Sequence, residues 1–130
     1  MVKLDPIIAV KNVEASAKWY QQVFGFKRAH GESDRFAVLV SEQEEVMLCL
    51  HSWGDHDHPT MTNPAIAPGN GLILYFRTSD INVIRQNIEK MNAQMEEEEH
   101  INPNSLKKEF SLRDLDGYYL TITEYHEYDG

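Results

Sequence analysis

The sequence predicts an α+β domain in which one β-α-β-β-β unit occurs twice. Each half opens with a strand and a helix, and a shift of 68 residues brings Asn12 onto Asp80 and Val13 onto Ile81. Three strand-like segments follow each helix, and a segment rich in His, Asp, Pro, Gly and Asn separates the halves. We therefore expect a single domain over residues 1–130, with module one at about 1–54, a linker at 55–69 and module two at about 70–127.

The first half begins with an apolar segment, residues 6–10, that is typical of a strand. Asn12 is placed to cap a helix at its N-terminus, and Gly25 is placed to end it in a left-handed conformation. Between them, one apolar face has helical spacing; it comprises Val13, Ala17, Tyr20, Val23 and Phe24. Strands are expected next at 26–32, 36–41 and 46–52.

The second half repeats this order. An apolar strand is expected at 71–78, and Asp80 is placed to cap the second helix. The apolar face of that helix comprises Ile81, Ile84, Ile88 and Met91. Strands are expected at 95–101, 106–113 and 118–125, with Asp116-Gly117 as the hairpin turn before the last one.

Composition and charge exclude several classes of partner. The formal net charge of −9, with no basic stripe to offset it, excludes nucleic acid as an expected partner. No apolar segment approaches the roughly 20 residues of a membrane span, and residues 1–10 lack the pattern of a signal peptide. Cys49 is the only cysteine. We expect a cytoplasmic protein with no membrane or nucleic-acid partner.

Three segments resemble the vicinal oxygen chelate family, which comprises glyoxalases, bleomycin resistance proteins and extradiol dioxygenases. They are PIIAVKNVEASAKWYQQVFGFKRA, EVMLCLHSWG and FSLRDLDGYYLTITE; in the last, Leu115 replaces a common proline. The resemblance implies paired βαβββ modules whose curved sheets enclose a cleft for a substrate and often a metal. It also implies a homodimer. Because family members include both enzymes and metal-free binding proteins, the fold does not decide the function.

Metal-dependent members of the family place His, Gln or Glu at four strand positions that face the cleft. Matching the motifs assigns these positions to Asp5, Leu48, Ile73 (or Leu72, if the register shifts by one) and Thr121. Only Asp5 carries a good ligand for a divalent ion. We therefore expect no metal and no other cofactor at these positions.

A rival metal hypothesis concerns the potential ligands between residues 51 and 58, which are His51, Asp55, His56, Asp57 and His58. A single residue separates His56 from His58, which is unusual for structural zinc, and no cysteine assists. A solvated polar loop is the favoured interpretation, with metal uptake by the loop left open.

Strand alternation then predicts which side chains share the cleft. Cys49 is expected to point toward the helix, as a small buried hydrophobic residue and not as a nucleophile. The candidate ligand-binding residues are Asp5, Leu48, His51, Trp53, Tyr75, Arg77, Tyr119 and Thr121. No catalytic residue is assigned. The expected function is metal-free binding of a small organic molecule by a sequestering or carrier protein, and the acidic charge favours a cationic ligand. The alternative is a metal-dependent lyase, transferase or dioxygenase of the same family.

Overall fold

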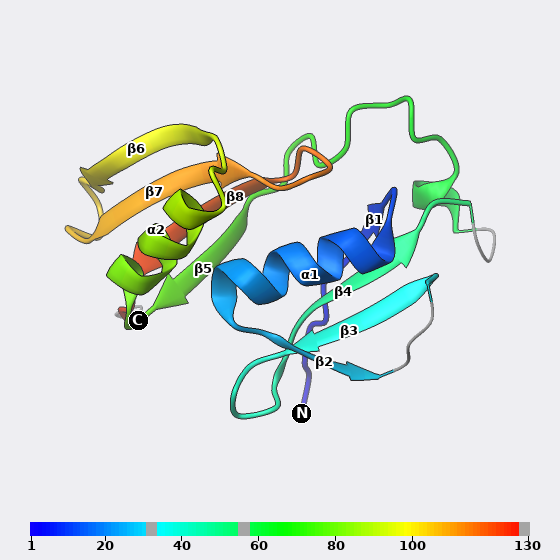
Figure 1. The fold of residues 1–130 in the computed structure, drawn as a ribbon, viewed down its shortest axis with the longest axis horizontal. Helices are drawn as coiled ribbons and strands as arrows, with labels where there is room; N and C mark the ends of the chain where they lie inside the picture. Colours follow the sequence, from blue (N-terminus) through cyan, green and yellow to red (C-terminus); the bar gives the residue numbers. More distant parts are fainter. Residues whose placement is uncertain (31–33, 55–57, 128–130) are drawn as a thin grey trace. The chain divides into compact units, whose positions relative to one another are not determined.

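The structure, a computed structural model, describes residues 1–30, 34–54 and 58–127 (Figure 1). It confirms the predicted α+β class: two four-stranded mixed sheets, each with one helix. The chain divides into two compact units, Met1–Ala67 and Pro68–Gly130. From here on, module one and module two denote these two units in place of the narrower ranges expected from the sequence. Neither helix in the described parts of the chain is long and apolar enough to cross a lipid bilayer.

Module one contains β1 (Ile7–Val10), α1 (Val13–Phe24), β2 (Lys27–His30), β3 (Phe36–Val40) and β4 (Val46–Ser52), followed by a 3₁₀ turn, η2 (Pro59–Met61). The strand order is β1-β4-β3-β2, with β1 and β4 parallel and the other pairs antiparallel. The predicted helix caps are confirmed. The Asn12 side chain accepts a hydrogen bond from the Ala15 amide at 2.9 Å, and Gly25 is left-handed with φ of 76°.

Module two repeats the topology with β5 (Leu74–Thr78), α2 (Ile81–Lys90), β6 (Met95–Ile101), β7 (Lys108–Arg113) and β8 (Tyr119–Glu124). The order is β5-β8-β7-β6, and β5 and β8 are the parallel pair. The structure places Asp80 at the N-cap of α2 without a side-chain capping bond. In Figure 1 each helix lies against one face of its own sheet.

Two predicted strands begin two or more residues later than expected, because turns occupy their first residues. Leu72 closes a turn by donating its amide to the Gly69 carbonyl, so β5 begins at Leu74. Leu106 has a φ of +61° and donates to the Asn102 carbonyl, so β7 begins at Lys108. The positive φ of Leu106 is incompatible with a regular strand.

The hairpin between β7 and β8 is confirmed, and a buried aspartate organises it. Gly117 has a φ of 94°, which favours glycine. One carboxylate oxygen of Asp114 accepts hydrogen bonds from the amides of Asp116 (3.0 Å) and Tyr118 (2.9 Å). This turn fixes the register of β7 against β8, and thereby the positions of the polar side chains described below.

Candidate functional site

Each sheet has a face covered by its helix and an opposite face, which we call the open face. In module one, Arg28 identifies the helix side, because its guanidinium pairs with Glu14 of α1 at 2.6 Å. Arg28 lies opposite Leu39, and Leu39 lies opposite Leu48. Leu39, Leu48 and Leu50 are fully buried on this side. The strand pairings put Ile7, Ala9, Phe36, Val38, Cys49 and His51 on the open face.

The placement of Leu48 and Cys49 corrects the alternation predicted from the sequence. Val40 lies opposite Val46 and Leu39 lies opposite Leu48, so Met47 is an extra residue in β4. Such a β-bulge interrupts the strict alternation of side chains. Leu48 therefore packs on the helix side instead of facing a ligand, and Cys49 takes the open face.

Asp5 precedes β1 and is exposed, and its charge acts on Cys49. Burial raises the pKa of the Cys49 thiol, and the negative charge of Asp5 raises that pKa further. A thiol with a raised pKa is protonated at neutral pH and is a poor nucleophile. The expectation that Cys49 is inert therefore agrees with its environment, although its side of the sheet was predicted wrongly.

His51 is buried on the open face of module one. Its Nδ1 donates a hydrogen bond to the Ser52 carbonyl at 2.6 Å, so Nε2 is the acceptor in the neutral ring. The ring has edge contacts with Phe36 and with His58, at centroid distances of 5.9 and 5.1 Å. Trp53 follows β4 and is half-buried. Asp55, His56 and Asp57 of the rival metal hypothesis lie outside the described residues.

The open face of module two carries the other sequence-predicted residues. Tyr75, Thr121 and Ser111 lie opposite one another in one row, and Arg77, Thr123 and Glu109 lie in the next. Tyr119 lies on the same face, opposite Arg113. The helix side of this sheet is identified by Arg85 of α2, whose guanidinium lies over Phe110.

Two of these residues are held by neighbouring groups. Arg77 donates to the His126 carbonyl at 2.7 Å, pairs with Glu127 at 3.9 Å, and lies over the Tyr125 ring. The hydroxyl of Tyr119 donates to Glu97 at 3.4 Å. Arg77 is therefore engaged by the C-terminal segment, and its contact with Glu127 is a surface ion pair.

The sequence analysis missed Glu109, a buried carboxylate on this open face with 7% of its surface exposed. Its Oε2 accepts a hydrogen bond from the Tyr75 hydroxyl at 3.2 Å, and its Oε1 accepts one from the side-chain Nδ2 of Asn102 at 2.8 Å. Nε2 of His100 lies 3.5 Å from Oε1. The alternation of polar and apolar residues in Glu-Phe-Ser-Leu-Arg of β7 is the signal that indicates this placement.

The four positions that the resemblance assigns to metal ligands do not fit a divalent ion. Leu48 and Ile73 have no donor atom, and Leu48 lies on the helix side. The hydroxyl of Thr121 shares a hydrogen bond of 2.9 Å with Ser111. Across residues 1–30, 34–54 and 58–127, no three His, Cys, Asp or Glu side chains gather as a metal site would require.

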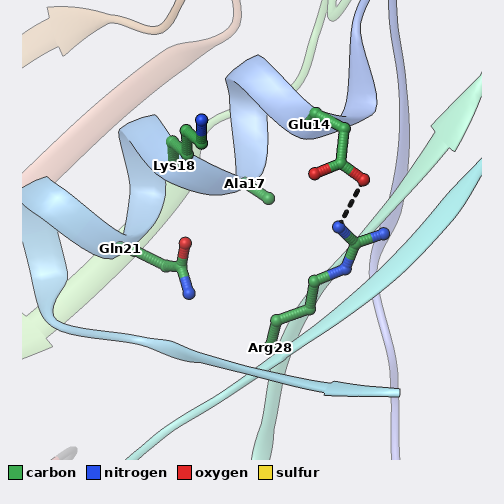
Figure 2. Close-up of a pocket in the computed structure, with 5 residues that line it drawn as sticks. All are labelled: Glu14, Ala17, Lys18, Gln21 and Arg28. Carbon is green, nitrogen blue, oxygen red and sulfur yellow. Dashed lines mark hydrogen bonds and ion pairs between the residues drawn. The ribbon is translucent and has the colours of Figure 1, made fainter. Parts of the chain in front are cut away.

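Two surface hollows lie in module one. One, of about 440 Å³, is lined by Glu14, Ala17, Lys18, Gln21 and Arg28, between α1 and β2 (Figure 2). The other, of about 430 Å³, has a floor that includes Val38, Val40 and Val46, with Lys27 and Glu44 also lining it. The first is on the helix side, where the Glu14–Arg28 ion pair crosses it. The second lies on the open face, where its valines would accommodate an organic group beside the charged side chains at its edge.

Replacing Leu48 with alanine tests the corrected register. Leu48 is fully buried against the helix side, so we expect Leu48→Ala to lower the free energy of unfolding by about 2–5 kcal/mol. Val46→Ala is the matched control; Val46 is 38% exposed on the open face and the loss is expected to be below about 1 kcal/mol. Urea denaturation measures both. Equal losses would contradict the bulge.

The ion pairs of His100 predict a pH dependence of stability. Its hydrogen bond to the Glu98 carbonyl and the charges of Glu97 and Glu109 raise its pKa above the ordinary value of 6.5, although burial opposes the shift. A raised histidine pKa stabilises the folded state below the ordinary pKa, and this stabilisation is lost as the pH rises through the raised value. We expect the stability advantage of wild type over His100→Gln to shrink over that range. Parallel pH curves from urea unfolding would refute this.

Comparison with known proteins supports the family that the sequence resembles. Residues 3–122 match the model of the Glyoxalase/Bleomycin resistance protein/Dioxygenase superfamily. No curated protein sequence matches at a significant level.

Solved structures share the fold at low sequence identity. A protein of unknown function from Agrobacterium tumefaciens has a TM-score of 0.76 and 21% identity, over 97% of this chain and 95% of that one. A lactoylglutathione lyase from the same organism has a TM-score of 0.72 and 17% identity, over 95% and 92%. An integron cassette protein from V. cholerae has a TM-score of 0.72 and 19% identity, over 97% of both chains. The matched family model covers most of the sequence, and the chain therefore belongs to the glyoxalase/bleomycin resistance protein/dioxygenase superfamily.

Proposed function

We propose that the protein binds a small organic molecule without a metal ion, as a sequestering or carrier protein. The observation that carries this proposal is the donor chemistry at the four metal positions of the family. Leu48 and Ile73 offer hydrocarbon, the hydroxyl of Thr121 is engaged by Ser111, and only Asp5 has a carboxylate. A catalytic divalent ion needs several oxygen or nitrogen ligands on one site, and these residues do not provide them.

The open faces provide the groups that an organic ligand requires. Module one offers the hollow over Val38, Val40 and Val46, with Lys27 and Glu44 beside these valines. Module two offers two tyrosines, Tyr75 and Tyr119, beside polar groups on a rigid sheet. Sites for small molecules combine an apolar surface with a few fixed polar groups, and each open face by itself carries groups of both kinds. The net charge of −9 favours a ligand that is cationic.

Metal analysis and ligand screening test this proposal together. We expect dialysed protein to contain far less than one zinc, nickel, iron or manganese per chain by elemental analysis. In a thermal-shift screen of cationic aromatics, glutathione conjugates, catechols and acyl-CoA esters, stabilisation by an organic cation in the presence of a chelator supports metal-free binding.

A requirement for added metal is the result that would contradict metal-free binding. Stabilisation that requires added nickel or iron, together with turnover of a glutathione conjugate or a catechol, would overturn the proposal. It would favour the alternative that the resemblance implies, a metal-dependent lyase, transferase or dioxygenase.

The proposal extends to a homodimer in the cytoplasm. Apolar side chains remain exposed in both modules of the isolated chain: Ile7 is 48% exposed and Ile73 is 58% exposed. Exposed apolar surface favours association with a ligand or with a second copy. Light scattering at high protein concentration is expected to give twice the mass of the 15.0 kDa chain. The mass of a single chain would contradict the dimer.

A further inference from the structure

A polar floor lies on the open face of module two, beside the buried carboxylate of Glu109. Ser111, Thr121 and Thr123 are 2%, 6% and 0% exposed, although α2 covers the other face of their sheet. Larger polar side chains on the same face surround them, including Tyr75 and His100. The floor is held by internal hydrogen bonds, of which the Ser111–Thr121 pair is one. A preformed polar surface of this kind orients a ligand at low entropic cost.

Glu109 is the charged group of this floor, and its neighbours fix its position. Asn102 holds Oε1 at 2.8 Å and Tyr75 holds Oε2 at 3.2 Å, and both are neutral hydrogen-bond donors. His100 is a titratable neighbour of Glu109, and in its protonated form it makes an ion pair with Oε1 across 3.5 Å. The carboxylate is therefore oriented by neutral groups, while its charge is balanced by a side chain that titrates near neutral pH.

We propose that the protein holds the positively charged group of an organic ligand at the Glu109 carboxylate, and that this group replaces His100 there. The proposal rests on the metal-free binding function and names the class of ligand. The ring of Tyr75 is part of the site. Tyr75 is 39% exposed and its hydroxyl bonds Glu109, so its aromatic ring lies next to the carboxylate and is accessible to a cation or to its apolar body.

His100 is suited to exchange because its contact with Glu109 is longer than those of Asn102 and Tyr75, while its Nδ1 stays anchored to the Glu98 carbonyl at 2.9 Å. Its Nε2 lies 3.5 Å from Glu109 and 3.6 Å from Glu97, and its side chain is 35% exposed. The charged and titratable groups that face it are Glu97 of its own strand, Glu109 of β7, and Tyr75 through Glu109. Arg113 of β7 instead pairs with Glu96 at 3.5 Å and lies over Tyr119.

The protonation state of His100 then controls access to the site. Protonated His100 competes with the ligand cation for the same carboxylate, whereas neutral His100 leaves the charges of Glu97 and Glu109 unbalanced. The raised pKa of His100 extends the protonated state toward neutral pH. Binding of the cation therefore releases a proton and strengthens as the pH rises through this range.

The experiment measures binding of benzamidinium, a flat organic cation, against benzamide, its neutral analogue of similar shape. Titration calorimetry or NMR shift titration is performed on wild type, Glu109→Gln and the control Glu98→Gln. The control removes the same charge from β6, but the Glu98 carboxylate pairs with Arg85 of α2 at 3.5 Å, on the helix side. We expect Glu109→Gln to weaken benzamidinium binding about tenfold or more and Glu98→Gln to weaken it less than about twofold.

The pH dependence of benzamidinium binding distinguishes binding at Glu109 from nonspecific attraction of a cation to an acidic protein. Wild type is expected to bind benzamidinium at least about threefold more weakly at pH about 5.5 than at pH about 9, on either side of the histidine range. His100→Gln is expected to lose this dependence, which distinguishes His100 from the other histidines of the chain. Benzamide binding is expected to be independent of pH. This comparison of wild type with His100→Gln needs no variant of Glu109. It therefore tests the proposal even if circular dichroism shows that Glu109→Gln is unfolded.

Three results would overturn the proposal. They are no saturable binding of benzamidinium at millimolar concentration, equal binding by wild type and folded Glu109→Gln, and a pH dependence that survives in His100→Gln. If another organic ligand still binds in the presence of a chelator, the metal-free binding function stands and only the assignment to Glu109 fails. A ligand that binds only with added metal overturns the binding function itself.

Discussion

The packing of each helix against one face of its own sheet determines which side chains remain for binding. In module one the buried side gathers Ile8, Val10, Leu39, Leu48 and Leu50, all with 4% exposure or less. Burial of such residues supplies most of the free energy that holds a module of this size together. Since neighbouring residues of a strand point to opposite faces, the side chains of the open face follow from this one requirement.

The sequence was sufficient for the fold and for much of module two. Helix spacing, the caps at Asn12 and Gly25, and the Asp-Gly hairpin are local signals, and each has a direct structural consequence. In β5 and β8 the alternation is regular, so Tyr75, Arg77, Tyr119 and Thr121 fall on one face as expected.

The errors occurred where the strands are irregular. The extra residue Met47 exchanges the faces of Leu48 and Cys49, and no composition signal marks such a bulge. The contact of Glu109 with His100 was also not predictable from the sequence, because the pairing of β6 with β7 changes register twice between Met95 and His100. Partners on strands that slip against each other are not found by counting along the sequence. Local sequence patterns determine the helices and strands, whereas long-range strand pairing determines which of their side chains come into contact.

The bulge in β4 has a consequence for how this strand tolerates changes in its length. Val46 lies on the open face before Met47, and Leu48 lies beneath α1 after it. Deletion of Met47 would therefore leave a regular strand in which both residues keep their faces, with the thiol of Cys49 and the imidazole of His51 still on the open face. The same deletion in a regular strand would exchange its two faces. The bulge thus marks the point of β4 at which a change in length leaves the chemistry offered to a ligand unaltered.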